Sequence, residues 1–420
     1  MPQRNNLTAY DFNNALCIDR PIRKACDCVS ASALFVHHKQ AMNYRFHDQH
    51  PFHPIRWELT MDLLNDLQAL STDRKLASRP ATEEELLWIH QPAYVESVKR
   101  LSSAAPEPHW ISEGEPYGLL DEDTPYFPGM HEAASWIVGG SITAVEAVLS
   151  GASPHALHLG GGLHHALPAK AAGFCIYNDA AIAIDYARRH YGARVLYVDT
   201  DVHHGDGVQW SFYSDPDVCT YSIHETGKYL FPGTGHLPER GEHQGYGACM
   251  NLPLQPYTED ASWLECFEES IRRLTKYFQP DLILSLHGCD AHALDPLSHM
   301  HCSMEIYRQM PAILHELAHT YCEGRWVALG GGGYDFWRVV PRAWSLLWLE
   351  MSSHPLANAL QTDARHPLPQ AWIDTWQPHT PQSLPSEWLD DAQRWESIPR
   401  RDEITAKNRE TLAVAMQDYP

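Results

Sequence analysis

The chain has 420 residues, of which 44% are apolar, enough to bury the core of one large α/β domain or of several smaller domains. Its 53 acidic residues outnumber its 31 basic residues and give a formal net charge of −22, which disfavours nucleic acid and anionic membranes as partners. The sequence shows no secretory signal, no run of about eighteen apolar residues and no repeated cysteine spacing. These features predict a cytoplasmic protein with a neutral or basic partner.

Helical signals begin after a polar, unpatterned stretch over residues 1–31, which we interpret as an N-terminal extension to a domain over residues 32–352. Helical spacing or capping residues predict helices over residues 56–70, from Thr82, over 131–149, over 178–191 and from Ser262. Residues 353–420 are expected to form a C-terminal tail that wraps around the domain and ends in a helix over 401–416.

Short apolar runs alternate with the predicted helices. They cover residues 155–159, 194–198, 218–223, 281–286 and 326–329. This alternation predicts an α/β fold, namely a single large domain with a mainly parallel central sheet and helices on both faces.

Four of these runs lead into unusual polar or glycine-rich clusters. The sequences that follow them are GGGLHH, DTDVHHGD, HGCD and GGGGY. Ligands of open parallel sheets bind at the carboxyl edge of the strands, so we expect the four clusters to converge on one site.

The cluster after residue 198 has the spacing of metal ligands. Asp201 and His203 are two residues apart, so their side chains leave the same face of an extended segment. Asp290 is the best candidate for a third ligand. Two carboxylates and one imidazole suit Zn²⁺, or Fe²⁺ and related ions, and an open coordination position would make the site catalytic. The alternative is that these aspartates only cap helices or form structural ion pairs.

Two adjacent histidines, His164 and His165, follow the triple glycine, while Asp199 and Asp206 are not needed as metal ligands. A carboxylate on the far nitrogen fixes the tautomer of a histidine and raises its basicity. Two such pairs beside an activated water would supply general acid–base catalysis. The alternative is a pair of surface histidines after a glycine turn. His204 has no evident role and is expected to point away from the metal.

Gly330–Gly333 lack the residues that complete a nucleotide-binding loop. We expect these glycines to let Tyr334 approach the metal and donate its hydroxyl to an oxyanion. Otherwise Tyr334 is a packed ring.

In this order the motifs resemble the zinc-dependent histone deacetylase family over residues 34–349. The sequences that carry the resemblance are GGLHHA, GFCIYND, DTDVHHGDG, FPGTG and GGGGY. Residues 45–56 and 398–410 resemble, in addition, the bacterial acetoin-utilisation branch of this family. The resemblance implies an arginase/deacetylase-like fold.

The resemblance also implies a role for each matching residue. Asp201, His203 and Asp290 would bind zinc. His164 would pair with Asp199 and His165 with Asp206, His165 would be the proton shuttle, and Tyr334 would hold the oxyanion. The implied substrate-binding residues are Gly173, Phe174, Phe231 and Leu297 in the tunnel walls, Asp123 at the rim and Arg56 in a channel for acetate. A structural potassium ion is implied at Asp199, Asp201, His203, Ser222 and Ile223.

The implied activity is zinc-dependent hydrolysis of acetyl-lysine to lysine and acetate. The branch name suggests an acetylated metabolic enzyme as substrate, such as acetyl-CoA synthetase. The alternatives are an acetylpolyamine amidohydrolase and a non-catalytic protein that binds acetyl-lysine or acetoin. One departure is the sequence Leu286-His287-Gly288-Cys289, which stands where many family members have a glutamine.

Overall fold

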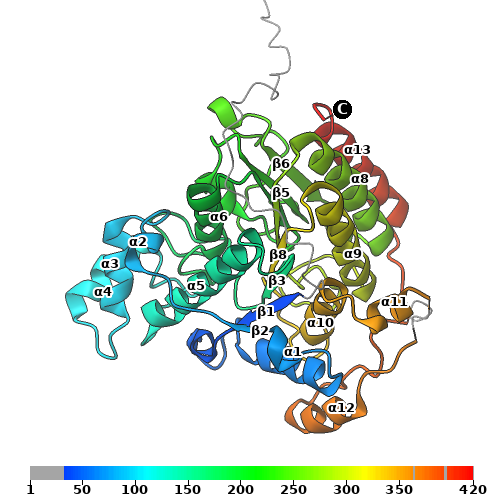
Figure 1. The fold of residues 1–420 in the computed structure, drawn as a ribbon, viewed down its shortest axis with the longest axis horizontal. Helices are drawn as coiled ribbons and strands as arrows, with labels where there is room; N and C mark the ends of the chain where they lie inside the picture. Colours follow the sequence, from blue (N-terminus) through cyan, green and yellow to red (C-terminus); the bar gives the residue numbers. More distant parts are fainter. Residues whose placement is uncertain (1–32, 363–364, 392–394, 420) are drawn as a thin grey trace, which may run out of the picture.

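The computed structural model describes residues 33–362, 365–391 and 395–419 (Figure 1). The predicted extension over residues 1–31 lies outside these residues. The described chain forms an eight-stranded sheet in the order β2-β1-β3-β8-β7-β4-β5-β6, and every neighbouring pair of strands is parallel. The predicted fold class, a single α/β domain around a parallel sheet, is confirmed.

The strands are β1 (Leu34–His37), β2 (Lys75–Ala77), β3 (His155–His158), β4 (Val195–Asp199), β5 (Val218–Glu225), β6 (Cys249–Leu254), β7 (Leu282–Leu286) and β8 (Trp326–Leu329). The helices are α1 (Ile55–Asp66), α2 (Glu83–Leu86), α3 (Pro92–Leu101), α4 (Pro108–Gly114), α5 (Met130–Leu149), α6 (Asp179–Tyr191), α7 (Asp206–Ser211), α8 (Asp260–Phe278), α9 (Met304–Tyr321), α10 (Val340–Met351), α11 (Pro355–Thr362), α12 (Gln370–Trp376) and α13 (Arg401–Ala415).

Helices cover both faces of the sheet. Helices α5 and α6 pack together on one face, and α8, α9, α10 and α1 follow one another across the other (Figure 1). All residues of β3, β4, β5, β7 and β8 are buried. Strands that are covered on both faces are rich in apolar residues, and each of these five contains a short apolar stretch, which is why the five runs were recognisable in the sequence.

The strands that the sequence did not predict lie at or near the edges of the sheet. Strand β2 has only three residues and is partly exposed, and β6 contains Asn251 and Pro253. Their composition therefore lacks the continuous apolar pattern of a central strand.

One predicted helix start was wrong. Helix α8 begins at Asp260 rather than at a capping box on Ser262. The Ser262 hydroxyl instead accepts a hydrogen bond from Asn408 Nδ2 in α13, at 3.0 Å. A tertiary contact thus uses the side chain that we had assigned to the cap.

Among the described residues, helix α5 has the length and the apolar composition that a membrane span would need. However, 78% of its apolar window is buried inside the protein, where it packs on β3 and α6. These contacts make α5 a core helix.

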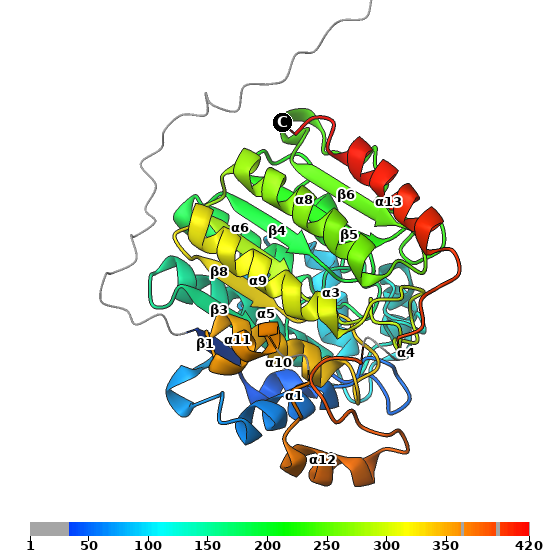
Figure 2. The same cartoon turned by 90° about the vertical axis from the view of Figure 1, so that its right-hand side faces the viewer.

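The C-terminal segment spreads over two distant parts of the domain (Figure 2). Helix α12 packs on α1, where the Trp372 indole donates to the Leu59 carbonyl oxygen at 3.0 Å. Helix α13 packs on α8 and β6, and its Asn408 side chain hydrogen-bonds to Gln255 N at 2.9 Å and Thr258 Oγ1 at 2.8 Å. Polar contacts of this kind hold the tail against the domain.

Candidate active site and metal centre

The polar clusters meet at one edge of the sheet. Strands β3, β8, β7 and β4 are neighbours in the sheet and run in the same direction, so the loops after their last residues lie side by side. These loops carry the glycine–histidine, glycine–tyrosine and aspartate–histidine motifs of the sequence.

Asp201, His203 and Asp290 form a buried group that could hold a metal ion. His203 Nδ1 lies 3.1 Å from Asp201 Oδ1 and 3.2 Å from Asp290 Oδ2. The second oxygen of each carboxylate accepts a backbone N–H, from Gly332 at 2.7 Å and from Val202 at 2.9 Å. One oxygen of each aspartate is therefore fixed in place and the other faces the imidazole.

The electrostatics of this group favour a bound cation. Burial opposes a charge on His203, but its hydrogen bonds to Asp201 and Asp290 outweigh burial and raise the pKa of this imidazole to about 10. Burial and the neighbouring Asp201 raise the pKa of Asp290 to about 6. A divalent cation in place of the His203 proton would neutralise both carboxylates, so the residues present fit zinc or a related ion.

Two histidine–aspartate pairs lie beside the metal-ligand candidates. His164 Nδ1 is 2.7 Å from Asp199 Oδ2, and His165 Nδ1 is 2.8 Å from Asp206 Oδ1. All four side chains are buried, and the two imidazole centroids are 4.0 Å apart. Since each Nδ1 faces a carboxylate, each Nε2 is left to face the site.

The two histidines differ in charge. Burial opposes protonation of His164, but Asp199 and Asp201 outweigh burial and raise the pKa of this imidazole to about 9. For His165, burial together with the charges of His164 and His203 lowers the pKa well below its usual value. These opposite shifts favour an imidazolium at His164 and a neutral imidazole at His165, that is, an acid and a base.

The loop after β8 brings Tyr334 to the same site. Tyr334 N donates to Asp295 Oδ2 at 2.7 Å, and the Arg56 guanidinium donates to the carbonyl oxygens of Gly331 at 2.9 Å and Gly333 at 3.1 Å. A Cβ at Gly332 would lie 2.2 Å from Asp290 Oδ2, so only glycine permits this approach. Burial, Asp290 and Asp201 raise the pKa of Tyr334 well above its usual value, which keeps the hydroxyl a donor.

Aromatic rings flank the metal-ligand candidates on two sides. The Phe174 and Tyr334 ring centroids are 5.6 Å apart, and the Phe231 centroid lies 4.9 Å from that of His165. Gly173 has a φ of 50°, and a Cβ there would lie 2.4 Å from His165 Cδ2. Phe231 is 43% exposed, so one wall of this arrangement borders solvent.

The remaining predicted residues lie around this centre. Asp123 is exposed and its carbonyl oxygen is 3.2 Å from His50 Nε2, whose ring contacts Phe174. Leu297 is partly exposed and its N–H donates to Asp295. Ser222 pairs with Asp199 in the β4–β5 register, so these two residues of the predicted potassium site are neighbours.

Sequence reasoning missed two buried carboxylates that position the loops. Asp179 accepts the N–H groups of Gly162 at 3.0 Å and Leu163 at 2.7 Å, directly before the histidine pair. Asp295 accepts from Tyr334 and Leu297. Asp179 was visible in the GFCIYND motif, whereas nothing near Asp295 distinguished it from a surface aspartate.

His204 and Cys289 lie next to ligand candidates in the sequence, and neither belongs to the Asp201, His203 and Asp290 group. His204 hydrogen-bonds to Thr234 Oγ1 at 2.8 Å and Gln209 Oε1 at 2.9 Å, so both of its ring nitrogens are engaged outside the Asp201, His203 and Asp290 group. Burial raises the pKa of the Cys289 thiol well above its usual value. Thiols in such surroundings are inert, because the thiolate is the reactive form.

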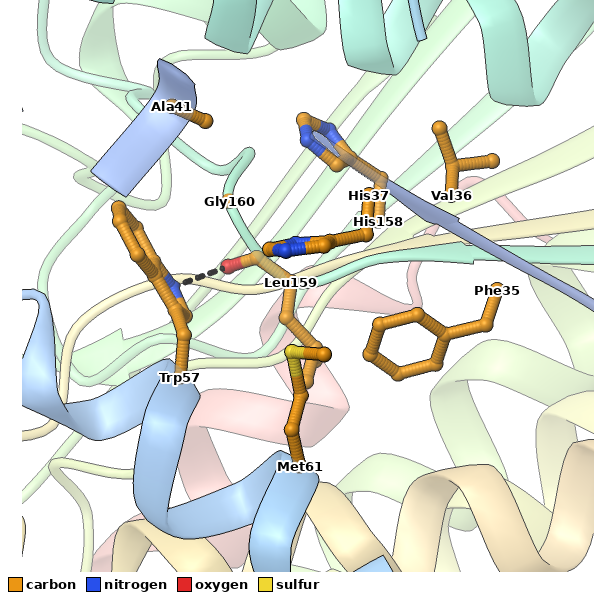
Figure 3. A pocket seen from close by; sticks show the side chains of 9 residues that line it. All are labelled: Phe35, Val36, His37, Ala41, Trp57, Met61, His158, Leu159 and Gly160. Atoms are coloured by element: carbon orange, nitrogen blue, oxygen red, sulfur yellow. Dashed lines mark hydrogen bonds between the residues drawn. The ribbon is translucent and has the colours of Figure 1, made fainter. Parts of the chain in front are cut away.

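A separate pocket lies beside β1 and α1 (Figure 3). Its lining includes Phe35, Met61 and His158, and the Trp57 indole there donates to the Leu159 carbonyl oxygen at 3.0 Å. This pocket is lined by none of the residues that the sequence predicted for the site.

Comparison with known proteins identifies the family. The histone deacetylase domain matches residues 50–351. The chain belongs to the histone deacetylase family. It is 50% identical to the acetoin utilization protein AcuC of Bacillus subtilis (strain 168) over 91% of this chain and 96% of that protein. It is 46% identical to AcuC of Staphylococcus aureus (strain COL) over 90% of this chain and 95% of that protein. The predicted likeness to the acetoin-utilisation branch is confirmed.

Solved structures of the family share the fold. A crystal structure of an HDAC homologue from Aquifex aeolicus is 27% identical, with a TM-score of 0.74, and covers 90% of this chain and 100% of its own. An HDAC homologue complexed with SAHA is 28% identical, with a TM-score of 0.75, and covers 91% and 100% respectively. The arginase/deacetylase-like fold and the enzyme class, a deacetylase hydrolase, are thus confirmed.

Proposed function

We propose that this deacetylase is a zinc-dependent protein lysine deacetylase, which hydrolyses acetyl-lysine to lysine and acetate. One observation carries the proposal: two buried histidine–aspartate pairs and Tyr334 surround the Asp201, His203 and Asp290 cluster at one edge of the sheet. An amide hydrolase needs a base, an acid and an oxyanion donor, and these groups supply all three.

Asp201, His203 and Asp290 would hold the ion, which when bound would polarise the acetyl carbonyl and acidify the attacking water. His165 takes the water proton, since it is the neutral imidazole and Asp206 fixes its Nδ1–H. Tyr334 donates its hydroxyl to the carbonyl oxygen as negative charge develops there. A histidine then gives a proton to the lysine amine as the C–N bond breaks, and acetate leaves.

The surrounding residues would bind the substrate. Phe174 and Phe231 would grip the apolar stem of acetyl-lysine, with Gly173 and Leu297 completing the walls. Asp123 is exposed at the rim, where its carboxylate would hold the peptide backbone. The buried Arg56 guanidinium would guide acetate away from the site.

We assign Zn²⁺ to the metal site, with Fe²⁺ as the alternative, because the mixed carboxylate and imidazole ligands suit both ions. We assign potassium to the junction of β4 and β5, bound by Ser222 and by backbone oxygens of Asp199, Asp201, His203 and Ile223. A cation there would offset the charge of the buried aspartates.

The substrate that we propose is an acetylated metabolic enzyme in the cytoplasm, with acetyl-CoA synthetase as the first candidate. The acetoin utilization names of the relatives and the formal charge of −22, which favours lysine-rich surfaces over nucleic acid or anionic membranes, support this choice.

A second candidate, an acetylpolyamine amidohydrolase, is favoured by the same negative charge, because polyamines are cations. The third candidate is a protein that binds acetyl-lysine or acetoin without turnover. It conflicts with the presence of a complete set of acid, base and oxyanion donor.

The decisive experiment offers the purified chain an acetyl-lysine peptide and acetylspermidine, and measures acetate release before chelation, after dialysis against a chelator and after zinc is added back. We expect metal-dependent release that is faster with the peptide. Faster release from acetylspermidine would favour the second candidate. Binding without release at any stage would favour the third and overturn our proposal.

A further inference from the structure

Three histidines converge at the opposite edge of the sheet from the active site. His155 is the first residue of β3. His315 and His319 lie one turn apart near the end of α9, a helix that lies over one face of the sheet (Figure 2). The three Nε2 atoms are 3.1 Å (His155–His315), 3.3 Å (His155–His319) and 3.2 Å (His315–His319) apart. Each imidazole thus points its Nε2 at the other two.

Hydrogen bonds between the rings cannot explain this arrangement. Each Nε2 carries either a hydrogen or a lone pair, so in any triangle of three such atoms at least two are alike and repel each other. The Glu350 carboxylate, 2.8 Å from His315 Nδ1, keeps the hydrogen on that nitrogen and leaves a lone pair on Nε2. A cation among the three nitrogens would accept all three lone pairs at once.

The distances match a metal centre. Zinc–imidazole bonds of about 2.0–2.1 Å in a tetrahedron place the ligand nitrogens about 3.3 Å apart, close to the separations found here. Two histidines four residues apart on one helix face are a recurrent zinc-binding pair. A metal-bound histidine usually donates its other ring N–H to a carboxylate, and Glu350 is placed to accept that hydrogen from His315.

The local sequence His315-Glu316-Leu317-Ala318-His319 also contains the glutamate of a metalloprotease motif. In this structure the Glu316 carboxylate is bound by both Nη atoms of Arg272, each at 2.8 Å, on the surface. It is therefore not available as a general base beside the three histidines. The cluster has the ligands for a metal but lacks a peptidase base.

The cluster is accessible from solvent. His155 is buried, His315 is partly exposed and His319 is exposed, so an ion can enter from solvent past His319.

We propose that His155, His315 and His319 form a second metal site, which binds a divalent transition ion, Zn²⁺ first, with solvent as the fourth ligand. The ion would join β3 to α9 and, through Glu350, to α10. This structural site is separate from the proposed function and would exist even if the active site had another substrate.

A cobalt titration tests the proposal, because tetrahedral Co²⁺ absorbs in the visible range and zinc displaces it. The protein to be titrated is the full chain with Asp201→Asn and Asp290→Asn, two substitutions that remove the carboxylate ligands of the candidate active site. We expect this protein to bind one equivalent of Co²⁺ with a tetrahedral spectrum. Adding His319→Gln should abolish that spectrum, and adding Glu350→Gln should weaken the affinity about 10–100-fold.

The matched control is His109→Gln, which changes an exposed histidine on α4 and should leave the titration unaltered. A complementary measurement uses the intact active site: the unchanged chain should retain two zinc ions and the His319→Gln chain one. The proposal is overturned if the Asp201→Asn, Asp290→Asn protein binds no metal, or if His319→Gln leaves its binding unchanged. Acetate release is not part of either readout, so a failed function and a failed site are distinguishable.

Discussion

The two edges of the sheet carry two metal-competent clusters of opposite character. At the carboxyl edge, Asp201, His203 and Asp290 are all buried, two of the three are carboxylates, and two histidine–aspartate pairs lie beside them. At the other edge, the histidine cluster of His155, His315 and His319 is open to solvent and lacks an available base. The two clusters thus differ less in their ligands than in their neighbours, because only the first has the histidine–aspartate pairs and Tyr334 beside it, the groups to which our proposed function gives the roles of acid, base and oxyanion donor.

The largest effect that we predict separates the two clusters by activity. Asp201→Asn should lower kcat for an acetyl-lysine peptide by about 10³-fold or more, because losing the ion removes several kcal/mol of transition-state stabilisation. His319→Gln should leave kcat unchanged. Steady-state kinetics with metal analysis of each variant checks both, and equal losses in the two variants would break the comparison.

Tyr334→Phe should lower kcat by about 10²–10³-fold while the bound metal is retained, since only the oxyanion donor is lost. Tyr229→Phe is a matched control, because Tyr229 is 66% exposed. Kinetics and metal content of both variants are the measurements. Undiminished turnover by Tyr334→Phe would remove this residue from the mechanism.

A third prediction concerns the pH dependence. The pKa of His164 is raised to about 9, so a step that needs its imidazolium fails as the pH rises through that value. Asp199→Asn removes the stabilising carboxylate and should move the alkaline limb of kcat down by about one to three pH units. Asp206→Asn, which alters the partner of His165, should lower kcat without moving this limb. Full pH profiles distinguish the two, and identical profiles would show that the histidine pairs are not specialised.

The smallest effect is a difference in protons released on metal binding. His203 has a pKa of about 10, so zinc at the active site should displace about one proton from it at neutral pH. His155 has a pKa of about 3 and has no proton to lose, so the histidine cluster should release fewer. Calorimetry in buffers of different ionisation enthalpy gives both numbers. Equal release at the two sites would contradict the contrast in charge.

The sequence located the residues of the candidate site better than it located the strands of the sheet around them. Asp199, Asp201, His203 and Asp206 are close in sequence and follow a fully buried strand, so a local pattern revealed them. Strands β2 and β6 lack a continuous apolar run and were missed, and β1 was missed although Leu34–Val36 is apolar. The cap on Ser262 was wrong because Asn408, from the far end of the chain, uses that hydroxyl.

The histidine cluster could not be predicted from local sequence patterns alone. The spacing of His315 and His319 is readable from the sequence, but their partner His155 lies 160 residues before His315 on another element. Only the packing of α9 on the sheet brings the three together. In the same way, Asp295 looks like any surface aspartate until the fold buries it against Tyr334 N.

The two hydrogen bonds that Asp295 accepts also lead to an expectation about the kinetics of the first turnover. The Asp295 carboxylate accepts the backbone N–H groups of Tyr334 and Leu297. It therefore connects the loop after β8 to the loop that follows Asp290, and both loops are held in place without a substrate. We therefore expect the Tyr334 hydroxyl to reach a substrate by rotation about its side-chain bonds, without movement of the backbone. A stopped-flow trace of the first turnover should accordingly begin without a lag.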